Sequence, residues 1–298
     1  TGDRMTTGPA EVFDLGYQGY EGQRTSRWRR RQAIWRDGIR ISLGLGRGAG
    51  AKIAPWLLIA LTLVPVVVLI VIASFAGSLG GDAASVDLPS FADYYGFAIV
   101  PISLFAAIVA PLLVCPDRED GVLALYAARP ITITDYVAAR WAAFLTVAAV
   151  ATWLPEALLF GWSALDAPNK GSWLADNWDV VPRFLLAGTC IAVVLTTLAL
   201  FTASFTARRA HAAVATLAVI FVGSAIGGIA EDNFSGRVSD VLSLAALPHV
   251  LTDTIRWIFG DTLTGRPLSG PADAAWLAVL TALLAAGLLR RTARRVRA

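Results

Sequence analysis

Several apolar runs in this sequence are longer than the roughly 18 residues that a helix needs to cross the hydrocarbon core of a bilayer. The chain is 56% hydrophobic and 16% charged, whereas about a quarter of the residues in ordinary soluble domains are charged. We therefore expect an all-α membrane protein with six transmembrane helices.

The expected spans are separated by short, more polar segments. They cover about residues 54–77, 91–114 or 97–114, 137–164, 180–206, a fifth run that ends near 230, and 272–289. Pro65 is expected to kink the first span without ending it, because transmembrane helices tolerate proline. The sequence thus divides into a basic region, 1–52, and a six-helix transmembrane domain, 53–298.

The positive charges test this count, because Lys and Arg accumulate in cytoplasmic segments. With both termini on the inner side, 20 of the 25 Lys and Arg residues fall on that side. They are ten in residues 1–52, then Arg118, Arg129 and Arg140, two between the fourth and fifth spans, and five in the C-terminal tail. We expect cytoplasmic termini, and we expect Arg140 to be a snorkelling cation whose head reaches the interface.

The basic region becomes periodic from Ser26 onward. Apolar residues follow at helical spacings, while arginines occupy the other faces. A basic amphipathic helix with tryptophans is typical of the interface plane of a membrane; a merely solvated basic tail is the alternative. The residues expected to form this interfacial helix are Trp28, Arg29, Arg30, Trp35, Arg36 and Ile39.

Glycines precede the first span, but they do not form a phosphate-binding loop. The Walker pattern requires Gly-Lys followed by Ser or Thr, and here the order is Gly50, Ala51, Lys52, Ile53. No nucleotide site is expected in this chain, and no nucleic-acid partner.

A polar, charge-bearing segment, 115–136, separates the second and third spans. Its acidic residues suit the first turn of a helix, because they complement the positive end of the helix dipole. The sequence predicts a short amphipathic helix over 117–128, ended by Pro130, which is suited to docking beneath a membrane; a solvated loop is the alternative. Thr132 or Thr134 is expected to cap the following helix.

Residues 231–271 between the last two spans are too long for a turn and too apolar for a disordered loop. Short apolar helices over 241–247 and 250–259, interrupted by Pro248, predict an outer helical hairpin over 239–260. Non-helical backbone at membrane depth needs protein cover, so the hairpin is expected to cap the outer end of the bundle.

Glu156 is an acidic residue within the predicted third span. Counting about 1.5 Å per residue places it near the outer boundary, so we expect an interfacial, solvated side chain. A role on a substrate or proton pathway is the alternative, because carboxylates within membranes are often functional. The sequence contains no metalloprotease or serine-hydrolase motif, so we expect no catalytic residues and no metal site.

The sequence resembles the type 2 family of ATP-binding-cassette (ABC) exporter permeases. In that family an acidic segment ending in glycine, a short apolar helix and a Pro-Ile or Pro-Leu element precede Asp-Tyr and the third helix. The N-terminal block 15–22, LGYQGYEG, resembles a subgroup common in high-GC bacteria. The matching positions are Asp117, Arg118, Glu119, Asp120 and Gly121, then Leu123, Leu125 and Tyr126, then Arg129, Pro130 and Ile131, and finally Asp135 and Tyr136.

This resemblance implies the membrane subunit of an exporter in a bacterial inner membrane. Two copies of a separately encoded ABC ATPase, which would hold ATP and Mg²⁺, would dock on the 117–130 segment. A second permease, identical or related, would complete a dimer, and the cargo would be lipophilic. An ion-coupled secondary transporter and a non-transporting membrane scaffold are the alternatives.

Overall fold

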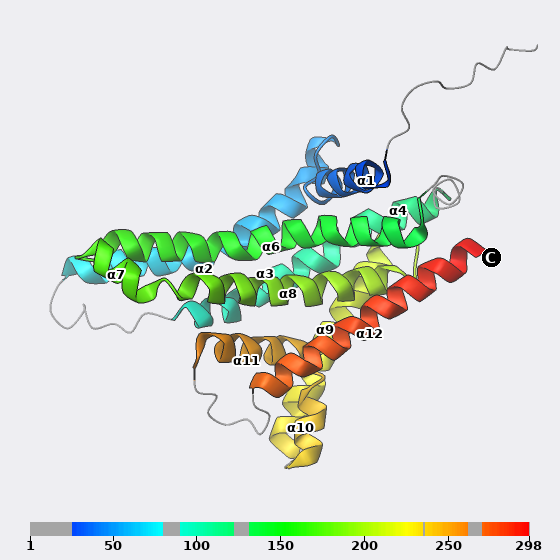
Figure 1. Cartoon of the computed structure of the whole chain (residues 1–298). Helices are drawn as coiled ribbons and strands as arrows, with labels where there is room; N and C mark the ends of the chain where they lie inside the picture. Colours follow the sequence, from blue (N-terminus) through cyan, green and yellow to red (C-terminus); the bar gives the residue numbers. More distant parts are fainter. Residues whose placement is uncertain (1–25, 80–89, 122–130, 235, 262–269, 298) are drawn as a thin grey trace, which may run out of the picture.

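The computed structural model describes residues 26–79, 90–121, 131–234, 236–261 and 270–297. Within these ranges every regular element is an α-helix (Figure 1). The helices are α1 (Arg27–Ser42), α2 (Ala49–Leu79), α3 (Phe91–Val109), α4 (Pro111–Glu119), α6 (Ile133–Asp166), α7 (Lys170–Asn177), α8 (Val180–Ala203), α9 (Arg209–Asn233), α10 (Arg237–Ser243), α11 (Leu247–Phe259) and α12 (Gly270–Arg297).

Six helices among the described residues are long and apolar enough to cross a membrane. They are α2, α3 continued by α4, α6, α8, α9 and α12. This finding indicates a multi-pass membrane protein and confirms the expected number of apolar spanning helices.

The helices differ from the expected spans mainly at their ends. Residues 170–177, expected to be a loop, form α7, whose N-cap is Asn169. The tail after residue 289 continues α12 as helix, because Ala and Arg, which make up most of it, are strong helix formers. Thr132, rather than Thr134, caps α6, and Asp135 completes a capping box with it.

The bundle has inner and outer helices. The most apolar stretches of α3–α4, α8 and α6 are 72%, 67% and 56% buried, whereas those of α2, α12 and α9 are 17%, 17% and 28% buried. Phe105 of α3 stacks on Phe144 of α6 with ring centroids 5.5 Å apart. The outer helices therefore present wide apolar faces, as lipid-facing helices do.

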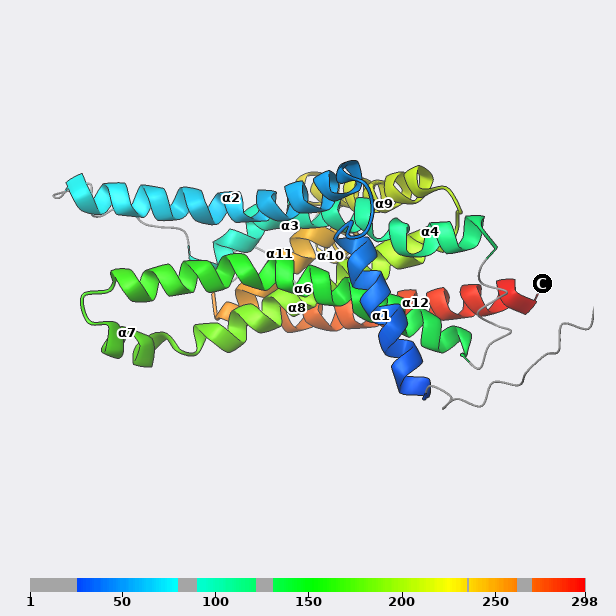
Figure 2. The same ribbon diagram turned by 90° about the horizontal axis from the view of Figure 1, so that it is seen from above.

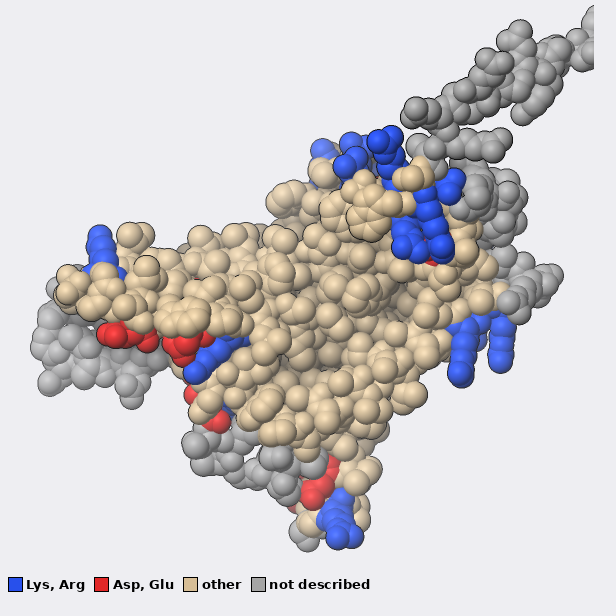
Figure 3. All heavy atoms as spheres, viewed as in Figure 1, with Lys and Arg blue, Asp and Glu red and all other residues tan. Residues whose placement is uncertain are grey.

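Charge separates the two ends of the bundle. We call the end that carries α1, the C-terminal turn of α4, the first turn of α6 and the end of α12 the basic end; α7 lies at the opposite end (Figure 1). Figure 3 shows Lys and Arg side chains gathered over α1 and at the end of α12, with much of the acidic surface of that view lying away from them.

Two helices, α10 and α11, lie between α9 and α12, and the first of them covers residues 237–243 rather than the expected 241–247. Pro248 lies in the first turn of α11, where its missing N–H costs nothing. The second expected helix, 250–259, therefore already begins at Leu247. Val250, Leu251, Thr254 and Ile255 form a buried face of α11 against the bundle.

Two of three closely spaced glycines on α9 allow a close approach within the chain. A Cβ atom on Gly223 would lie 2.2 Å from the carbonyl oxygen of Ala245, and one on Gly227 would lie 2.4 Å from the Cβ of Ala246. The third glycine of that group, Gly228, faces open space. Two of the three glycines are therefore used to seat the α10–α11 connection.

Helix α1 crosses α6 rather than running beside it, as Figure 2 shows. Its buried line is Ile34, Gly38 and Ser42. A Cβ atom on Gly38 would lie 2.5 Å from the Cβ of Ala143, so the crossing is close because residue 38 has no side chain.

Gly38→Ala is expected to destabilise the protein by about 1–3 kcal/mol, the usual cost of overpacking. In an Ala143→Gly background the same substitution should cost nothing further, because the opposing methyl group is gone. Gly96→Ala, a helical glycine with open space around it, is the matched control. Thermal unfolding in detergent measures all four variants, and an equal loss from Gly38→Ala in both backgrounds would contradict the contact.

Candidate functional site

The acidic residues expected to begin a docking helix instead end one. α4 runs to Glu119, Asp120 is its cap, and Gly121 has a φ of 67°. A glycine with positive φ just beyond a helix is a common way for helices to end. The boundary predicted from the acidic residues was therefore wrong: Asp117, Arg118 and Glu119 lie in the last turn of α4.

The prediction failed because a tertiary contact overrides the helix dipole. A carboxylate at a helix C-terminus is unfavourable by itself. Asp117, however, accepts hydrogen bonds from the Tyr136 hydroxyl at 2.6 Å and from Arg140 Nη2 at 2.9 Å. Glu119 and Asp120 are exposed, so they remain available to a partner.

The rest of the expected docking segment lies outside the described residues. This applies to Leu123, Leu125, Tyr126, Arg129 and Pro130, which fall in the range 122–130. A docking helix there remains a prediction from sequence.

Arg140 is the centre of the site. Its Nη1 donates to Asp37 Oδ2 of α1 at 2.9 Å, and its Nη2 donates to Asp117 of α4. The residue is 2% exposed, so the expectation of a snorkelling cation is wrong. Arginine suits this position because its planar guanidinium can serve two carboxylates at once.

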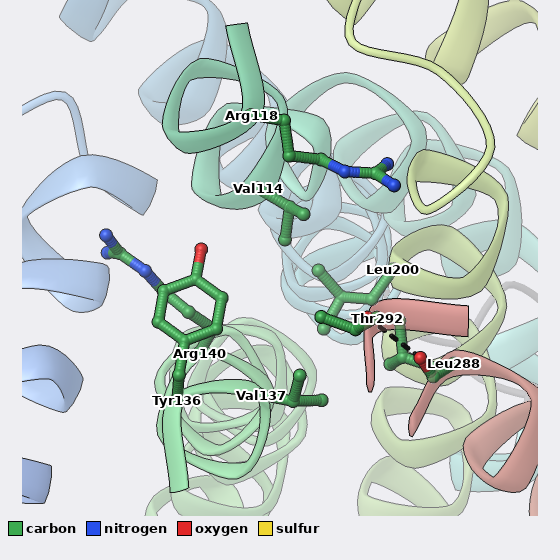
Figure 4. Close-up of a pocket in the computed structure, with 8 residues that line it drawn as sticks. All are labelled: Val114, Arg118, Tyr136, Val137, Arg140, Leu200, Leu288 and Thr292. Carbon is green, nitrogen blue, oxygen red and sulfur yellow. Dashed lines mark hydrogen bonds between the residues drawn. The ribbon is translucent and has the colours of Figure 1, made fainter. Parts of the chain in front are cut away.

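Arg118 serves a different contact. Figure 4 shows its guanidinium pointing toward α8 and the α8–α9 turn, away from that of Arg140. Its Nη1 donates to the carbonyl oxygens of Ala203 at 2.8 Å and Thr206 at 3.3 Å. The cavity between α4, α6, α8 and α12 beside these arginines measures about 10 Å³, space for about one water, so these helices are closed against one another at the basic end.

Asp135 is a second anchor for α1. It is 1% exposed and accepts hydrogen bonds from Arg27 Nε at 2.7 Å, from Arg31, and from the backbone N–H of Thr132. The hydrogen bonds from Arg27 to this carboxylate raise the pKa of the Arg27 guanidinium. One carboxylate therefore starts α6 and also ties the first turns of α1 to it.

The residues expected on the interfacial helix lie on α1 but surround its buried line rather than form it. Trp28 is 64% exposed, Arg29 and Arg36 are exposed, and Arg30 is half-buried. Trp35 and Ile39 pack at the edge of the core. The apolar stripe read from the sequence therefore flanks the face that contacts α6.

A groove runs between α1 and α6. It encloses about 540 Å³ and is lined by Trp28 and Trp35 on one side and by the small residues Ala138, Ala139 and Ala142 on the other. Trp35 Nε1 also donates to Thr146 at 3.2 Å. Of the two tryptophans that line this groove, Trp28 is exposed and Trp35 is half-buried.

Glu156 is not the solvated interfacial residue that was expected. It is 0% exposed, and neither carboxyl oxygen has a hydrogen-bond partner among the described residues. Counting along the helix gives depth but not lateral position, and α3 covers this side of α6.

Sequence reasoning missed two of the site's main contacts. Asp37 was not singled out, although it is the one acidic residue in the arginine-rich stretch 27–42. A single carboxylate among arginines is a usable signal for a buried cation nearby. The pairing of Asp135 with Arg27 and Arg31 carried no local signal, because these residues are more than 100 positions apart.

No model of a known protein family matches this chain. No curated protein sequence matches it either.

Arg140→Met is expected to lower the free energy of unfolding by about 2–3 kcal/mol. This is less than the roughly 3–5 kcal/mol for breaking a fully buried pair, because the Asp37 side chain is 56% exposed. The stability of Arg140→Lys should fall between that of the parent and that of Arg140→Met, because one ammonium cannot bridge both carboxylates in the same geometry. Arg36→Met, on the exposed side of α1, is the control; denaturant unfolding that ranks Arg36→Met level with Arg140→Met would refute the bridge.

Proposed function

We propose that this chain is the membrane permease subunit of an ABC exporter, driven by a separately encoded ATPase that docks on residues 117–130. The observation that carries the proposal is the bridge from Arg140 to Asp37 and Asp117. It joins the first residue of the docking segment to α6 and to α1, so a force applied to that segment reaches the spanning helices directly.

The exposed residues of the segment suit a partner. Glu119, Asp120 and Gly121 are exposed, whereas Asp117 and Arg118 bond inward to α6 and to the α8–α9 turn. A coupling element needs one surface that binds the partner and another that is bonded to the bundle. ATP and Mg²⁺ would be held by the partner ATPase, in two copies, and this chain would supply no catalytic residue.

The orientation follows from charge. The basic end, with α1 and the end of α12, would face the cytoplasm of a bacterial cell, in keeping with the positive-inside rule. Helix α1 would lie in the inner interface, and α10 with α11 would belong to the outer half of the bundle.

Closure of the ATPases would push α4 and α6 as one unit, and the bundle would change from inward-facing to outward-facing. A second permease, identical or related, would share the pathway. The wide apolar faces of α2, α9 and α12 leave room for both this partner and bilayer lipid, and they suit a lipophilic cargo that enters from the membrane.

Ion-coupled transport is the second candidate, and the buried carboxyl of Glu156 favours it. A transporter of that class would work without an ATPase. Co-purification therefore separates the two functions.

The test is a pull-down of the tagged chain from its native membranes in mild detergent, with ATP hydrolysis as the readout. Glu119→Arg reverses an exposed charge in the docking segment and is expected to abolish co-purifying ATPase activity. Asp166→Arg, an equally drastic change at the exposed far end of α6, should leave it intact. Absence of an ATPase from the parent chain, under conditions that preserve the complex, would remove the exporter proposal and leave ion-coupled transport or a non-transporting scaffold.

A further inference from the structure

Glu156 lies inside the bundle on α6, directly after Pro155. It is completely buried, and both carboxyl oxygens lack a hydrogen-bond partner among the described residues. An ionised carboxylate in such surroundings carries a large desolvation cost unless a cation or several donors compensate it.

Two tyrosines near Glu156 already use their hydroxyl hydrogens in other hydrogen bonds. Tyr94 and Tyr95 of α3 lie within electrostatic range of Glu156. The Tyr94 hydroxyl donates to the carbonyl oxygen of Thr62 at 3.0 Å, and the Tyr95 hydroxyl donates to that of Phe184 at 2.9 Å. A tyrosine has a single O–H, so both donors are already used, and only lone pairs remain for Glu156.

The charged residues close to these tyrosines are paired with one another at the surface. Asp93, next to Tyr94 in α3, pairs with Arg256 of α11 at 3.3 Å, and their side chains are 38% and 47% exposed. Arg183 of α8 pairs with Asp179 at 2.8 Å. Each pair therefore balances its own charge, and among the described residues neither pair is hydrogen-bonded to Glu156.

We propose that Glu156 is a proton-binding site: its carboxyl is neutral in the packed bundle and releases its proton when α6 separates from α3. On separation the carboxyl O–H bond breaks, the proton passes to the water that enters, and a hydrated carboxylate is left. The change from packed to open bundle is thereby coupled to the release of one proton.

This inference does not depend on the exporter proposal. It concerns this chain alone, and it can be tested without an ATPase present. If no ATPase co-purifies, the proposal about Glu156 still stands. If the tests of Glu156 fail, the docking proposal is unaffected.

Infrared difference spectroscopy in lipid vesicles at neutral pH tests the protonation directly. Subtraction of the Glu156→Gln spectrum from that of the parent is expected to show the C=O stretch of a protonated carboxyl, lost in the variant. Glu119→Gln is the control, because a water-exposed glutamate should lose carboxylate bands instead. Loss of carboxylate bands in Glu156→Gln would overturn the proposal.

Proton release is tested by the pH dependence of unfolding in detergent. In the unfolded chain Glu156 ionises above about pH 4, whereas in the packed chain it stays neutral, so its contribution to stability is greatest in acid and declines as the pH rises. As the pH rises, the unfolding equilibrium constant of the parent should therefore increase relative to that of Glu156→Gln, by up to about tenfold per pH unit. Parallel pH profiles of parent and variant would contradict proton uptake by this residue.

Discussion

The arrangement of the basic end depends on one buried guanidinium. Arg140 brings no favourable hydrophobic contribution, and desolvating it is costly, so its position is stable only while carboxylates meet it from two sides. Asp37 comes from α1 and Asp117 from the last turn of α4. Three elements distant in sequence must therefore assemble together, which explains why α1 crosses α6 at this level and why α4 can end on an acidic residue.

A second, purely steric constraint acts at the same crossing. Gly38 lets α1 approach α6 until backbone and small side chains meet, while Asp135 holds the first turns of α1 through Arg27 and Arg31. Two sets of ion pairs, and the close approach at Gly38 next to Asp37, fix the angle of α1. The inner helices α3, α6 and α8 supply most of the buried surface, and the outer helices α2, α9 and α12 leave wide apolar faces exposed.

Much of the architecture could be predicted from local signals. Apolar runs predicted the six spanning helices, and Thr132, one of two expected caps, marks the start of α6. The site was less predictable, because its contacts join residues on different helices. The dipole rule placed Asp117 at a helix start, since it could not anticipate the compensating charge of Arg140. Helix rise gave an expected depth for Glu156 but no information about the helices that bury it.

The central claim is that Arg140 makes α1 and the end of α4 one unit with α6. Hydrogen–deuterium exchange, followed by mass spectrometry, measures this directly in the parent and in Arg140→Met. We expect faster exchange in two separate segments, residues 27–42 and 111–119, because both lose the same partner. Faster exchange confined to the peptides around residue 140, with α1 and α4 protected as in the parent, would contradict the account.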